Sequence, residues 1–520
     1  MKNLASLLSF LLLVPAVQLS AQDGTLDPSF SGDGLLSADC GGSSFDQGRA
    51  VTIQDDGSII VVGTSGPSKS LDFGVARFLE DGTYDDTFSF DGVERVAPGP
   101  AEDHATCVVV QPDGKILVGG YSLCSEGNCF TLLRFLDDGT LDPDFGEGGI
   151  VITEYTGGYA LEAKVMALQD DGKILLAGGG AGGFAAVRYR ANGTVDVEFG
   201  TDGLATCAFS AGSDRANGIA LLDDGKIILS GYSANNEIDS IAVTRLTNDG
   251  IIDESFGSGG RVCAAIPGRR TIGQALAMGP AGEIVVAGYY INPLAVEPLA
   301  MVARFTAEGV LDTDLNGTGL RSLAPAGSSA SILNAAVVQA DGKIIVCGAV
   351  TNANSDFFLM RLNTDGSDDL TFNTSGTTIT DFTGTFDRAN GMALQSDGRI
   401  VVVGETNAGT QDYNFALARY LNSGFTSIAE NDGSDLRLRV TNPVSEVVTV
   451  TFALTEQDIV SMDLFDMRGA FVQHLMRPRT GAKGANTVTL PVGPDLCNGP
   501  YVLSLRGKQV QATAKLIVDR

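Results

Sequence analysis

The sequence predicts an all-β protein, a seven-bladed β-propeller of about 57 residues per blade followed by a small C-terminal β-sandwich. Three markers recur seven times in the same order: a D-G turn motif that ends in Phe, a D-G hairpin that ends in Gly, and an Arg. Each repeat holds about four short strands, which is typical of a propeller blade. We therefore divide the chain into a signal peptide (1–21), a propeller (22–424), a linker (425–435) and a sandwich (436–520).

The first segment has the pattern of a secretory signal peptide. Lys2 precedes an apolar stretch from Leu4 to Val17, and Ala21 offers a small residue for cleavage before Gln22. A membrane anchor is the alternative, but it needs about 20 apolar residues, and Pro15 interrupts the stretch. No later stretch is long and apolar enough to span a bilayer, so we expect an exported chain without a transmembrane segment.

The chain is strongly acidic. Among its 520 residues, 34 are Lys or Arg and 63 are Asp or Glu, which gives a formal net charge of −29. A phosphate backbone or an anionic lipid surface repels such a chain at long range. Nucleic acid is therefore not an expected partner, and we interpret the acidity as solubility outside the cell.

The first marker has the form D-G-x-x-D-x-x-F. It reads DGTLDPSF from Asp23 and DGTLDPDF from Asp138. Its second carboxylate recurs once per unit, at Asp27, Asp85, Asp142, Asp196, Asp253, Asp312 and Asp369. Its aromatic residue recurs at Phe30, Phe88, Phe145, Phe199, Phe256 and Phe372, with Leu315 in the sixth copy. A large apolar residue that returns in every unit predicts core packing between sheets.

The second marker is a hairpin signal, in which an apolar run, a D-G turn and a second apolar run ending in Gly follow one another. It reads QPDGKILVGG from Gln111 and QDDGKILLAG from Gln169. The third marker is an Arg that follows each hairpin turn by about 20 residues, at Arg77, Arg134, Arg188, Arg245, Arg304, Arg361 and Arg419.

The recurring Asp and Arg are predicted to be structural. A ring has one axis but repeats each blade position, so a side chain required identically in every blade suits a structural contact better than a catalytic one. An Arg–Asp pair or an Asp-capped turn would then hold each blade. A ligand role is the alternative.

The order of the markers favours a closed ring. The chain begins with the first marker and the period stops just after the Arg strand of the last unit, which leaves closure to N- and C-terminal strands. A β-solenoid is the alternative, but solenoids need atypical polar caps, and the terminal units here resemble the others.

The eight Cys residues permit disulfides in an exported chain. Cys124 and Cys129 share the short loop SLCSEGNC, whose geometry decides whether they form a bridge. The others are scattered without a C-x-x-C pair and are interpreted as small buried residues, at Cys40, Cys107, Cys207, Cys263, Cys347 and Cys497.

Calcium is the one cofactor that the turns suggest. The run DDGTLDPD from Asp137 offers several carboxylates, but its spacing departs from the D-x-[DN]-x-[DN]-G calcium loop. We therefore expect no cofactor, with calcium as the alternative and the metal ligands unassigned.

The sequence contains few residues in patterns typical of a catalytic site. His104 and His474 are the two His residues, and neither has the sequence neighbours of a Ser-His-Asp or Cys-His site. The sequence lacks zinc-ligand clusters and a G-x-S-x-G elbow. We assign no catalytic residue, although the paired carboxylates of a glycoside hydrolase are an alternative among 63 acids.

Binding specificity is expected where the repeat is least regular. Tyr121, Tyr232, Tyr289 and Tyr290 follow the second hairpin strand and are candidates for a loop face, with core packing as the alternative. The least repetitive loops are Ser122 to Cys129, Ala234 to Asp239 and Tyr290 to Pro298.

The two recurring signatures, D-G-x-x-D-x-x-F and Q-x-D-G-K-I-x-V-x-G, resemble the delta-60 repeat of bacterial β-propeller proteins from Asp23 to about Asn422. Two positions depart from the pattern, because Ala281 replaces the usual Asp of a hairpin turn and Leu315 replaces the usual Phe. The resemblance implies a propeller and no particular activity.

The segment after Gly424 loses the period and reads as six to seven strands of a β-sandwich. It is similar to the type A C-terminal sorting domain of proteins exported by the type IX secretion system of Bacteroidota. The matching positions include Asn442, Pro443, Gly469, Gly499, Tyr501 and Lys515, whereas Thr441 stands where an aromatic residue is frequent. The resemblance implies recognition by the type IX machinery, and a purely structural sandwich is the alternative.

Three functions follow as expectations for a chain that is secreted, extracellular or at the outer-membrane surface. The first is a binding module for an unknown extracellular protein or glycan, with its site where the blade loops converge. The second is an enzyme that acts on an extracellular polymer, of the glycoside hydrolase or lyase type. The third is a passive structural or adhesive surface protein. Fold alone does not decide among them.

Overall fold

The structure is a computed structural model. It describes residues 22–40, 45–67, 70–125, 127–155, 161–180, 182–210, 212–234, 239–292, 297–325, 327–382, 386–407, 413–422, 439–440, 447–454, 457–466, 471–493, 496, 499–506 and 511–518. The signal peptide, the linker and Asn442, Pro443, Gly469 and Cys497 lie outside the described residues.

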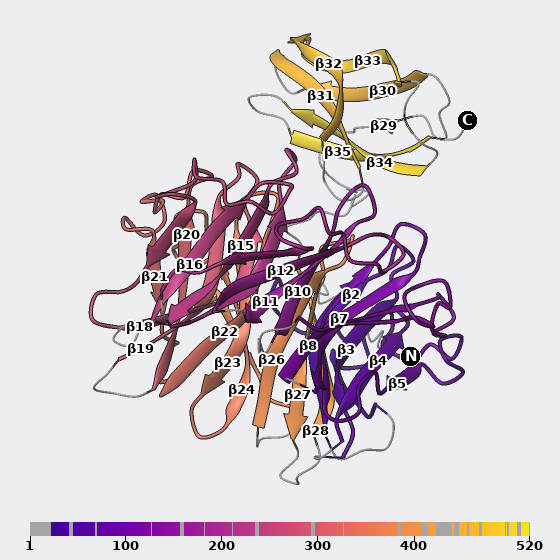
Figure 1. Ribbon diagram of the computed structural model, residues 1–520. Coiled ribbons are helices and arrows are strands. Elements are labelled where there is room, and N and C mark those ends of the chain that lie inside the picture. The colour runs from indigo at the N-terminus through magenta and orange to yellow at the C-terminus, as the bar shows by residue number, and fades with distance from the viewer. Residues whose placement is uncertain are drawn as a thin grey trace, which may run out of the picture.

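The described strands of the propeller form seven antiparallel groups of four (Figure 1). The first strands are β2 (Asp46–Ile53), β6 (Asp103–Val110), β10 (Glu162–Leu168), β14 (Ser213–Leu221), β18 (Arg270–Met278), β22 (Ala330–Val338) and β26 (Phe386–Leu394). The second strands are β3 (Ile59–Ser65), β7 (Ile116–Cys124), β11 (Ile174–Gly180), β15 (Ile227–Ala234), β19 (Ile284–Ile291), β23 (Ile344–Thr351) and β27 (Ile400–Asn407). These strands form the seven predicted hairpins.

The two outer positions of each blade follow the same order. The third strands are β4 (Asp72–Phe78), β8 (Gly127–Phe135), β12 (Gly183–Tyr189), β16 (Asp239–Leu246), β20 (Pro298–Phe305), β24 (Ser355–Leu362) and β28 (Tyr413–Tyr420). The fourth strands are β5 (Val93–Val96), β9 (Ile150–Thr153), β13 (Leu204–Cys207), β17 (Arg261–Ala264), β21 (Leu320–Leu323), β25 (Thr377–Thr380) and β1 (Leu35–Ala38). The all-β propeller predicted from the repeats is confirmed.

The ring closes through its N-terminal strand. β1 pairs antiparallel with β28, with Leu35 opposite Ala418, so the first strand of the chain completes the last blade. Each first strand contacts the first strand of the next blade, and β26 contacts β2 in turn. The first strands therefore encircle a common axis.

The hairpin motif explains the inner edge of each blade. Every first strand shifts register at a β-bulge. The residue that the bulge leaves unpaired lies eight positions before the Gly of the hairpin turn. Opposite the bulge stands the Gly that ends the motif. A Cβ at this position would lie between 1.8 and 2.0 Å from a carbonyl oxygen of the first strand, so only glycine fits at Gly63, Gly120, Gly178, Gly231, Gly288, Gly348 and Gly404.

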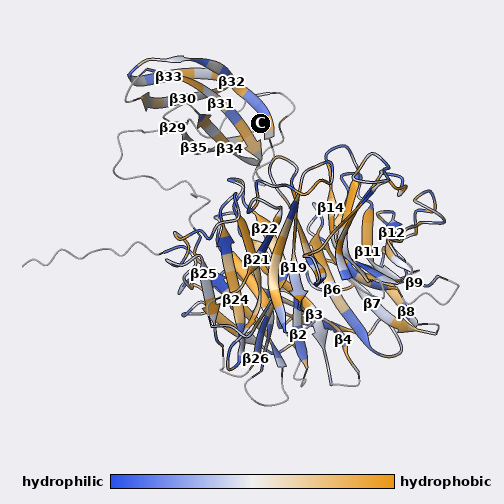
Figure 2. Cartoon of the chain, turned by 90° about the vertical axis from the view of Figure 1, so that its left-hand side faces the viewer, coloured by the Kyte–Doolittle hydropathy of each residue, from blue (hydrophilic) through white to orange (hydrophobic). Residues whose placement is uncertain are grey.

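The core lies between neighbouring blades. The Phe of the first marker, or Leu315, is fully buried in every blade, as its repetition predicted. The marker's Gly has a positive φ and lies against the aromatic ring of the preceding unit, as Gly82 does on Phe30, and Gly24 lies against Phe372 across the ring closure. Figure 2 shows hydrophobic colour along the strands and hydrophilic colour along most loops, as expected for stacked sheets.

The propeller has two chemically different ends. The hairpin turns and the D-G-x-x-D turns lie at one end, which we call the turn face. The loops between second and third strands and the connections from one blade to the next lie at the other end, which we call the loop face. The loop-face end of each first strand includes the residues just before the bulge.

The C-terminal segment forms two facing sheets. One sheet has the order β29 (Arg439–Val440), β30 (Val447–Leu454) and β33 (Gly484–Pro491). The other has the order β32 (Phe471–Gly481), β31 (Asp458–Asp466), β34 (Gly499–Arg506) and β35 (Gln511–Val518). Residues from both sheets share one core, which includes Val450, Val488, Met462 and Leu503. Tyr501 is buried in this core, and Lys515 pairs in register with Val502.

Candidate functional site at the propeller axis

The repeated Arg and Asp meet in every blade. The Arg lies on the third strand, and its Nε donates to Oδ2 of the marker's second Asp. The distances are 2.7 Å for Arg77–Asp85, 2.8 Å for Arg134–Asp142, Arg188–Asp196, Arg245–Asp253 and Arg419–Asp27, 2.6 Å for Arg304–Asp312 and 2.7 Å for Arg361–Asp369. The same Asp caps its own turn, because Asp85 Oδ1 accepts bonds from Thr87 N and Oγ1 at 3.0 and 2.6 Å. The ion pair and the Asp-capped turn thus coexist at one residue.

Each Arg also links its blade to the next one. Arg77 Nη1 donates to the Asp137 carbonyl at 2.7 Å, and Arg134 Nη1 donates to the Ala191 carbonyl at 2.6 Å. The guanidinium lies over the aromatic ring of its own marker, 5.0 Å from the ring centre for Arg77 and Phe88. At the closure Arg419 donates to the carbonyl of Glu80 in the first blade. These groups are therefore engaged within the ring, which leaves little for a ligand.

Hydrogen bonds and charge keep the Asp carboxyls ionised. Burial alone would raise the pKa of Asp85, but the bonds from Thr87 and the charge of Arg77 outweigh it and lower the pKa. The pKa of Asp253 is lowered by its bond from Ser255 and by Arg245. The carboxyls of Asp85 and Asp253 are thus ionised at neutral pH.

Two further predicted features lie away from the axis. Cys124 and Cys129 form a disulfide between the ends of β7 and β8, at the loop face. In the turn where calcium was the alternative, Asp138 Oδ1 accepts bonds from Thr140 N and Oγ1 at 3.0 and 2.6 Å. Asp142 is taken by Arg134. Calcium stays an untested alternative, and the carboxylates of this turn are already engaged within it.

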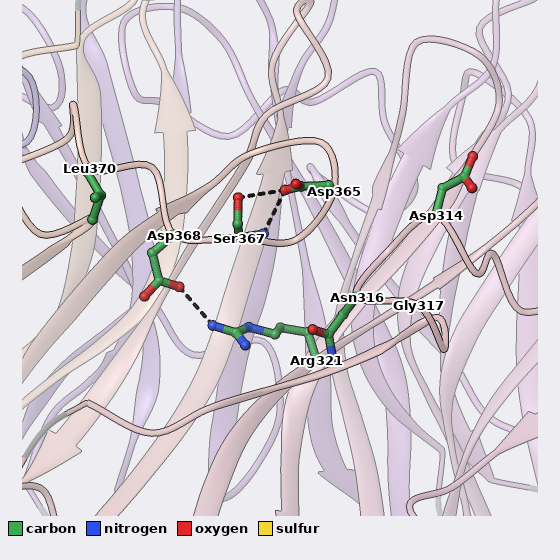
Figure 3. Close-up of a pocket in the computed structure, with 8 residues that line it drawn as sticks. All are labelled: Asp314, Asn316, Gly317, Arg321, Asp365, Ser367, Asp368 and Leu370. Carbon is green, nitrogen blue, oxygen red and sulfur yellow. Dashed lines mark hydrogen bonds and ion pairs between the residues drawn. The ribbon is translucent and has the colours of Figure 1, made fainter.

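Two acidic groupings occur in the part of the chain that the structure describes. An open depression of about 570 Å³ between two turns is lined by Asp314, Asp365 and Asp368 (Figure 3). There Arg321 pairs with Asp368 at 3.0 Å. Carboxylate oxygens of Asp356, Asp381 and Asp387 approach within 4.8 Å at the loop face, where Asp387 accepts bonds from Phe382 N and Thr406 Oγ1. Both groupings are held by contacts within the fold.

The residues skipped by the bulges form a polar ring around the axis. They are Arg49, Thr106, Lys164, Asn217, Gln274, Asn334 and Asn390. Four of them donate to the carbonyl just before the next bulge: Asn217 to Gly273 at 2.8 Å, Asn334 to Ala389 at 2.8 Å, Asn390 to Gly48 at 2.9 Å and Thr106 to Ala163 at 3.1 Å. Arg49, Lys164 and Gln274 make no such bond among the described residues. The polar ring therefore lacks this hydrogen bond in the first, third and fifth blades, and two of these three residues are cations.

Charged and aromatic side chains gather beside Arg49 and Lys164. We call the group the axial cluster, and it comprises Arg49, His104, Tyr121, Glu162, Lys164, Arg215, Tyr232, Arg388 and Glu405. Tyr121 and His104 stand opposite each other on β7 and β6, with ring centres 4.8 Å apart. Lys164 Nζ lies 5.1 Å from the centre of the Tyr121 ring, and Arg215 pairs with Glu162 of the preceding blade.

The charges of the cluster act on one another across the axis. Burial lowers the pKa of Lys164. The charge of Glu162 opposes this decrease, and the charges of Arg215 and Arg49 add to it. Burial lowers the pKa of His104. Glu102, whose carboxylate lies 3.9 Å from Nε2, opposes the decrease, and Arg49 and Lys164 add to it. Burial lowers the pKa of Arg388 as well, with a contribution from Arg49. Four cations thus share one site with two carboxylates, in a chain whose overall charge is −29.

The cluster has accessible and unsatisfied groups. The side chains of Lys164 and Arg215 are 32% and 39% exposed, and that of His104 is 25% exposed. Arg388 Nε and Glu405 Oε2 are buried without a hydrogen-bond partner among the described residues. Buried polar groups are normally paired, so these atoms leave hydrogen-bonding capacity at the axis.

The Tyr candidates divide between the axis and the core. Tyr121, Tyr232 and Tyr289 are half-buried and stand opposite first-strand residues at the loop face. Tyr290 is 9% exposed and its hydroxyl bonds to Ser322 at 2.9 Å, so it belongs to the core. Sequence reasoning missed Arg49, Lys164 and Arg388. For Arg49 and Lys164 the signal is a charged residue at the bulge position, a fixed distance before the Gly of the D-G turn. Arg388 lies two residues before the bulge residue Asn390 and has no such signal.

Seven antiparallel blades closed by the N-terminal strand, with a sandwich appended, define a repeat β-propeller with an accessory β domain. The chain belongs to the proteins with DUF5122 β-propeller repeats and a secretion system C-terminal sorting domain. The repeats match the family "Domain of unknown function (DUF5122) beta-propeller" at residues 54–88, 111–145, 169–199, 222–256, 339–372 and 395–425. The sorting domain matches at residues 442–519. The unmatched unit between 256 and 339 contains Ala281 and Leu315.

The sorting domain determines where the protein is found. It identifies a chain handled by the type IX secretion machinery and secreted to the cell surface or the extracellular space. In the part of the chain that the structure describes, no helix has the length and apolar character needed to cross a membrane.

Several solved structures match the chain at low sequence identity. Sqt1 of Chaetomium thermophilum is 13% identical, covers 75% of this chain and 99% of its own, and has a TM-score of 0.37. A polysaccharide lyase of family PL25, an ulvan lyase, is 12% identical, with 77% and 94% covered and a TM-score of 0.41. Drosophila Semaphorin 2a is 8% identical, with 96% and 99% covered and a TM-score of 0.42. No curated protein matches the chain.

Proposed function

We propose that this secreted propeller is an extracellular binding module whose ligand binds at the axial cluster on the loop face. The observation that supports the proposal is that two of the three bulge residues outside the polar ring's hydrogen-bonding rule, Arg49 and Lys164, are cations beside other charged side chains. A structural ring would repeat one hydrogen bond in every blade, as four of the seven bulge residues do. Residues that leave such a rule at a converging point are candidates for binding rather than for folding.

The loops chosen from the sequence lie at the same end of the ring. The described parts of 122–129, 234–239 and 290–298 connect second to third strands, which places them at the loop face. Asp239 holds Arg270 at 2.6 Å, and the disulfide of Cys124 and Cys129 fastens another of these loops. A fixed rim around a charged centre suits recognition, because less order is lost when a ligand binds.

A binding array tests the proposal. The secreted protein is applied to extracellular polysaccharides and proteins, beside Tyr232→Ala at the loop face and Ile251→Ala at the turn face. Ile251 is 63% exposed, so its replacement serves as a matched control. We expect the ligand to be lost with Tyr232→Ala and kept with Ile251→Ala. Loss with Ile251→Ala alone would move the site to the turn face and contradict the proposal.

A polymer-acting enzyme is the second candidate, favoured by His104. Burial lowers its pKa, so the imidazole is neutral at pH 7 and has the protonation state of a general base. It stacks on Tyr121 beside Lys164 and Arg49. Burial raises the pKa of Asp72, Asp103 and Asp356, but these lie outside the axial cluster. New reducing ends on a bound polymer, absent with His104→Ala, would favour the enzyme. Binding without product would favour the module.

A further inference from the structure

We propose that the axial cluster recognises the anionic group, a uronate carboxylate or a sulfate ester, of an extracellular polysaccharide. Arg49 and Lys164 would be its charge partners, and the ring of Tyr121 would lie beside the sugar. This inference rests on the proposed binding function and names the class of ligand.

Charge gives the first reason. Arg49 and Arg215 each lower the pKa of Lys164, which means that the three cations repel one another at the axis. Glu162 lies 4.0 Å from Lys164 Nζ and opposes the decrease, but it is also paired with Arg215 and accepts a bond from Asn128 at 3.2 Å, so one carboxylate serves two cations. A bound anion would relieve this repulsion.

The free hydrogen-bonding capacity gives the second reason. Arg388 Nε is buried without a hydrogen-bond partner among the described residues. The charge of Glu405 on the same blade raises the pKa of Arg388, and the charge of Arg49 on the next blade lowers it. In the part of the chain that the structure describes, the Arg49 side chain bonds only to the neutral side chain of Gln47, at 2.6 Å. Guanidinium groups bind carboxylates and sulfates through charge-assisted bonds, which are about twice as strong as neutral ones. The site thus offers donors that suit an oxyanion.

The aromatic side chains favour a sugar over an acidic peptide. Tyr121, Tyr232 and Tyr289 belong to the second, fourth and fifth blades. Each stands at the equivalent position of its second strand. Burial raises the pKa of all three, so each stays a neutral phenol at physiological pH. A pyranose ring presents an apolar face and a hydroxyl edge, and a tyrosine offers a matching ring face and hydroxyl. Arg215 stands opposite Tyr232, which brings charge and ring together.

Calorimetric titration of the secreted protein tests the inference with defined probes. These are a galacturonate tetramer, a sulfated tetrasaccharide, a neutral glucose tetramer and a glutamate tetrapeptide. We expect the two anionic sugars to bind more tightly than the other two, and their affinity to fall as NaCl is raised. Tighter binding of the glutamate peptide would assign the site to acidic protein segments and contradict a polysaccharide ligand. If the neutral sugar bound as tightly as the anionic ones, recognition of an anionic group would be contradicted.

Variants separate this inference from the binding function itself. Arg49→Gln and Lys164→Gln should each weaken the anionic sugar about tenfold, the loss of one charge-assisted bond, whereas Arg49→Lys should restore part of the affinity. Arg190→Gln, at a side chain 52% exposed near a turn, should change nothing. Thermal unfolding of each variant shows whether it folds. If binding is lost with Tyr232→Ala but unaffected by the charge variants and by NaCl, the ligand binds at the axial site without an anionic group. If no substitution at the axial site affects binding, both the binding site and the anion are wrong.

Discussion

At the scale of single residues, the recurring Arg and Asp hold the propeller together. Each Arg pairs with the Asp of its marker and reaches the next blade, and six of the seven also lie over an aromatic ring. In the blades where the Asp is buried, removal of the Arg leaves a buried carboxylate without its charge partner. The cost of such a loss is far larger than that of an exposed ion pair. In the third blade one carboxylate, that of Asp196, forms both a buried pair with Arg188 and an exposed pair with Arg190.

Arg188→Met tests this difference. Arg188 is 4% exposed and lies 2.8 Å from Asp196, whereas Arg190 is 52% exposed and lies 3.6 Å from the same carboxylate. We expect Arg188→Met to lower the free energy of unfolding by about 3–5 kcal/mol and Arg190→Gln by about 0.5 kcal/mol. Urea denaturation measures both. Equal effects would show that the recurring Arg is dispensable.

The lowered pKa of Asp85 predicts how that pair responds to acid. A carboxyl with a lowered folded-state pKa stabilises the protein above its unfolded pKa of about 3.9 and loses that contribution as pH falls through its folded pKa. Asp85→Asn should therefore destabilise the protein at pH 7, and the gap from wild type should close only below about pH 4. Unfolding free energies at successive pH values measure the gap. A gap that closed between pH 7 and 5 would contradict the assigned ionisation.

At the scale of elements, the closure of the ring depends on β1. It completes the last blade against β28 and brings Asp27 to Arg419 over most of the chain length. We expect removal of residues 22–40 to leave an unpaired strand edge and an unpaired buried Arg, and so to give a protein that self-associates. Size-exclusion chromatography and denaturation measure this. A monomer with wild-type stability would mean that β1 is not needed for closure.

The elements also show how far sequence reasoning reaches. The hairpins, the turns and the Arg strand were predictable because the same chemistry recurs in every blade and only one backbone conformation suits D-G or the Gly opposite a bulge. The axial cluster was not, because Arg49 and Lys164 occupy a bulge position whose residue type changes from blade to blade. Tyr290 could not be told from Tyr289, since adjacent strand residues point to opposite faces and the register decides which is buried.

At the scale of the whole molecule, the C-terminal sandwich and the propeller have separate tasks. The sandwich has its own core and matches a sorting domain, whereas the charged axis belongs to the propeller. We expect a chain lacking residues 436–520 to stay in the periplasm with a folded propeller. Cell fractionation and protease accessibility measure the location. Surface display of the truncated chain would show that another segment directs export.

The location of the binding site is tested most directly by hydroxyl-radical footprinting of the secreted protein, free and on the surface of the producing cells. We expect protection of His104, Tyr121 and Tyr232 on the loop face, and unchanged labelling of Ile251 and Leu370, which are 63% and 66% exposed in turns. Protection of the turn residues, with the axial side chains labelled as in the free protein, would contradict the account.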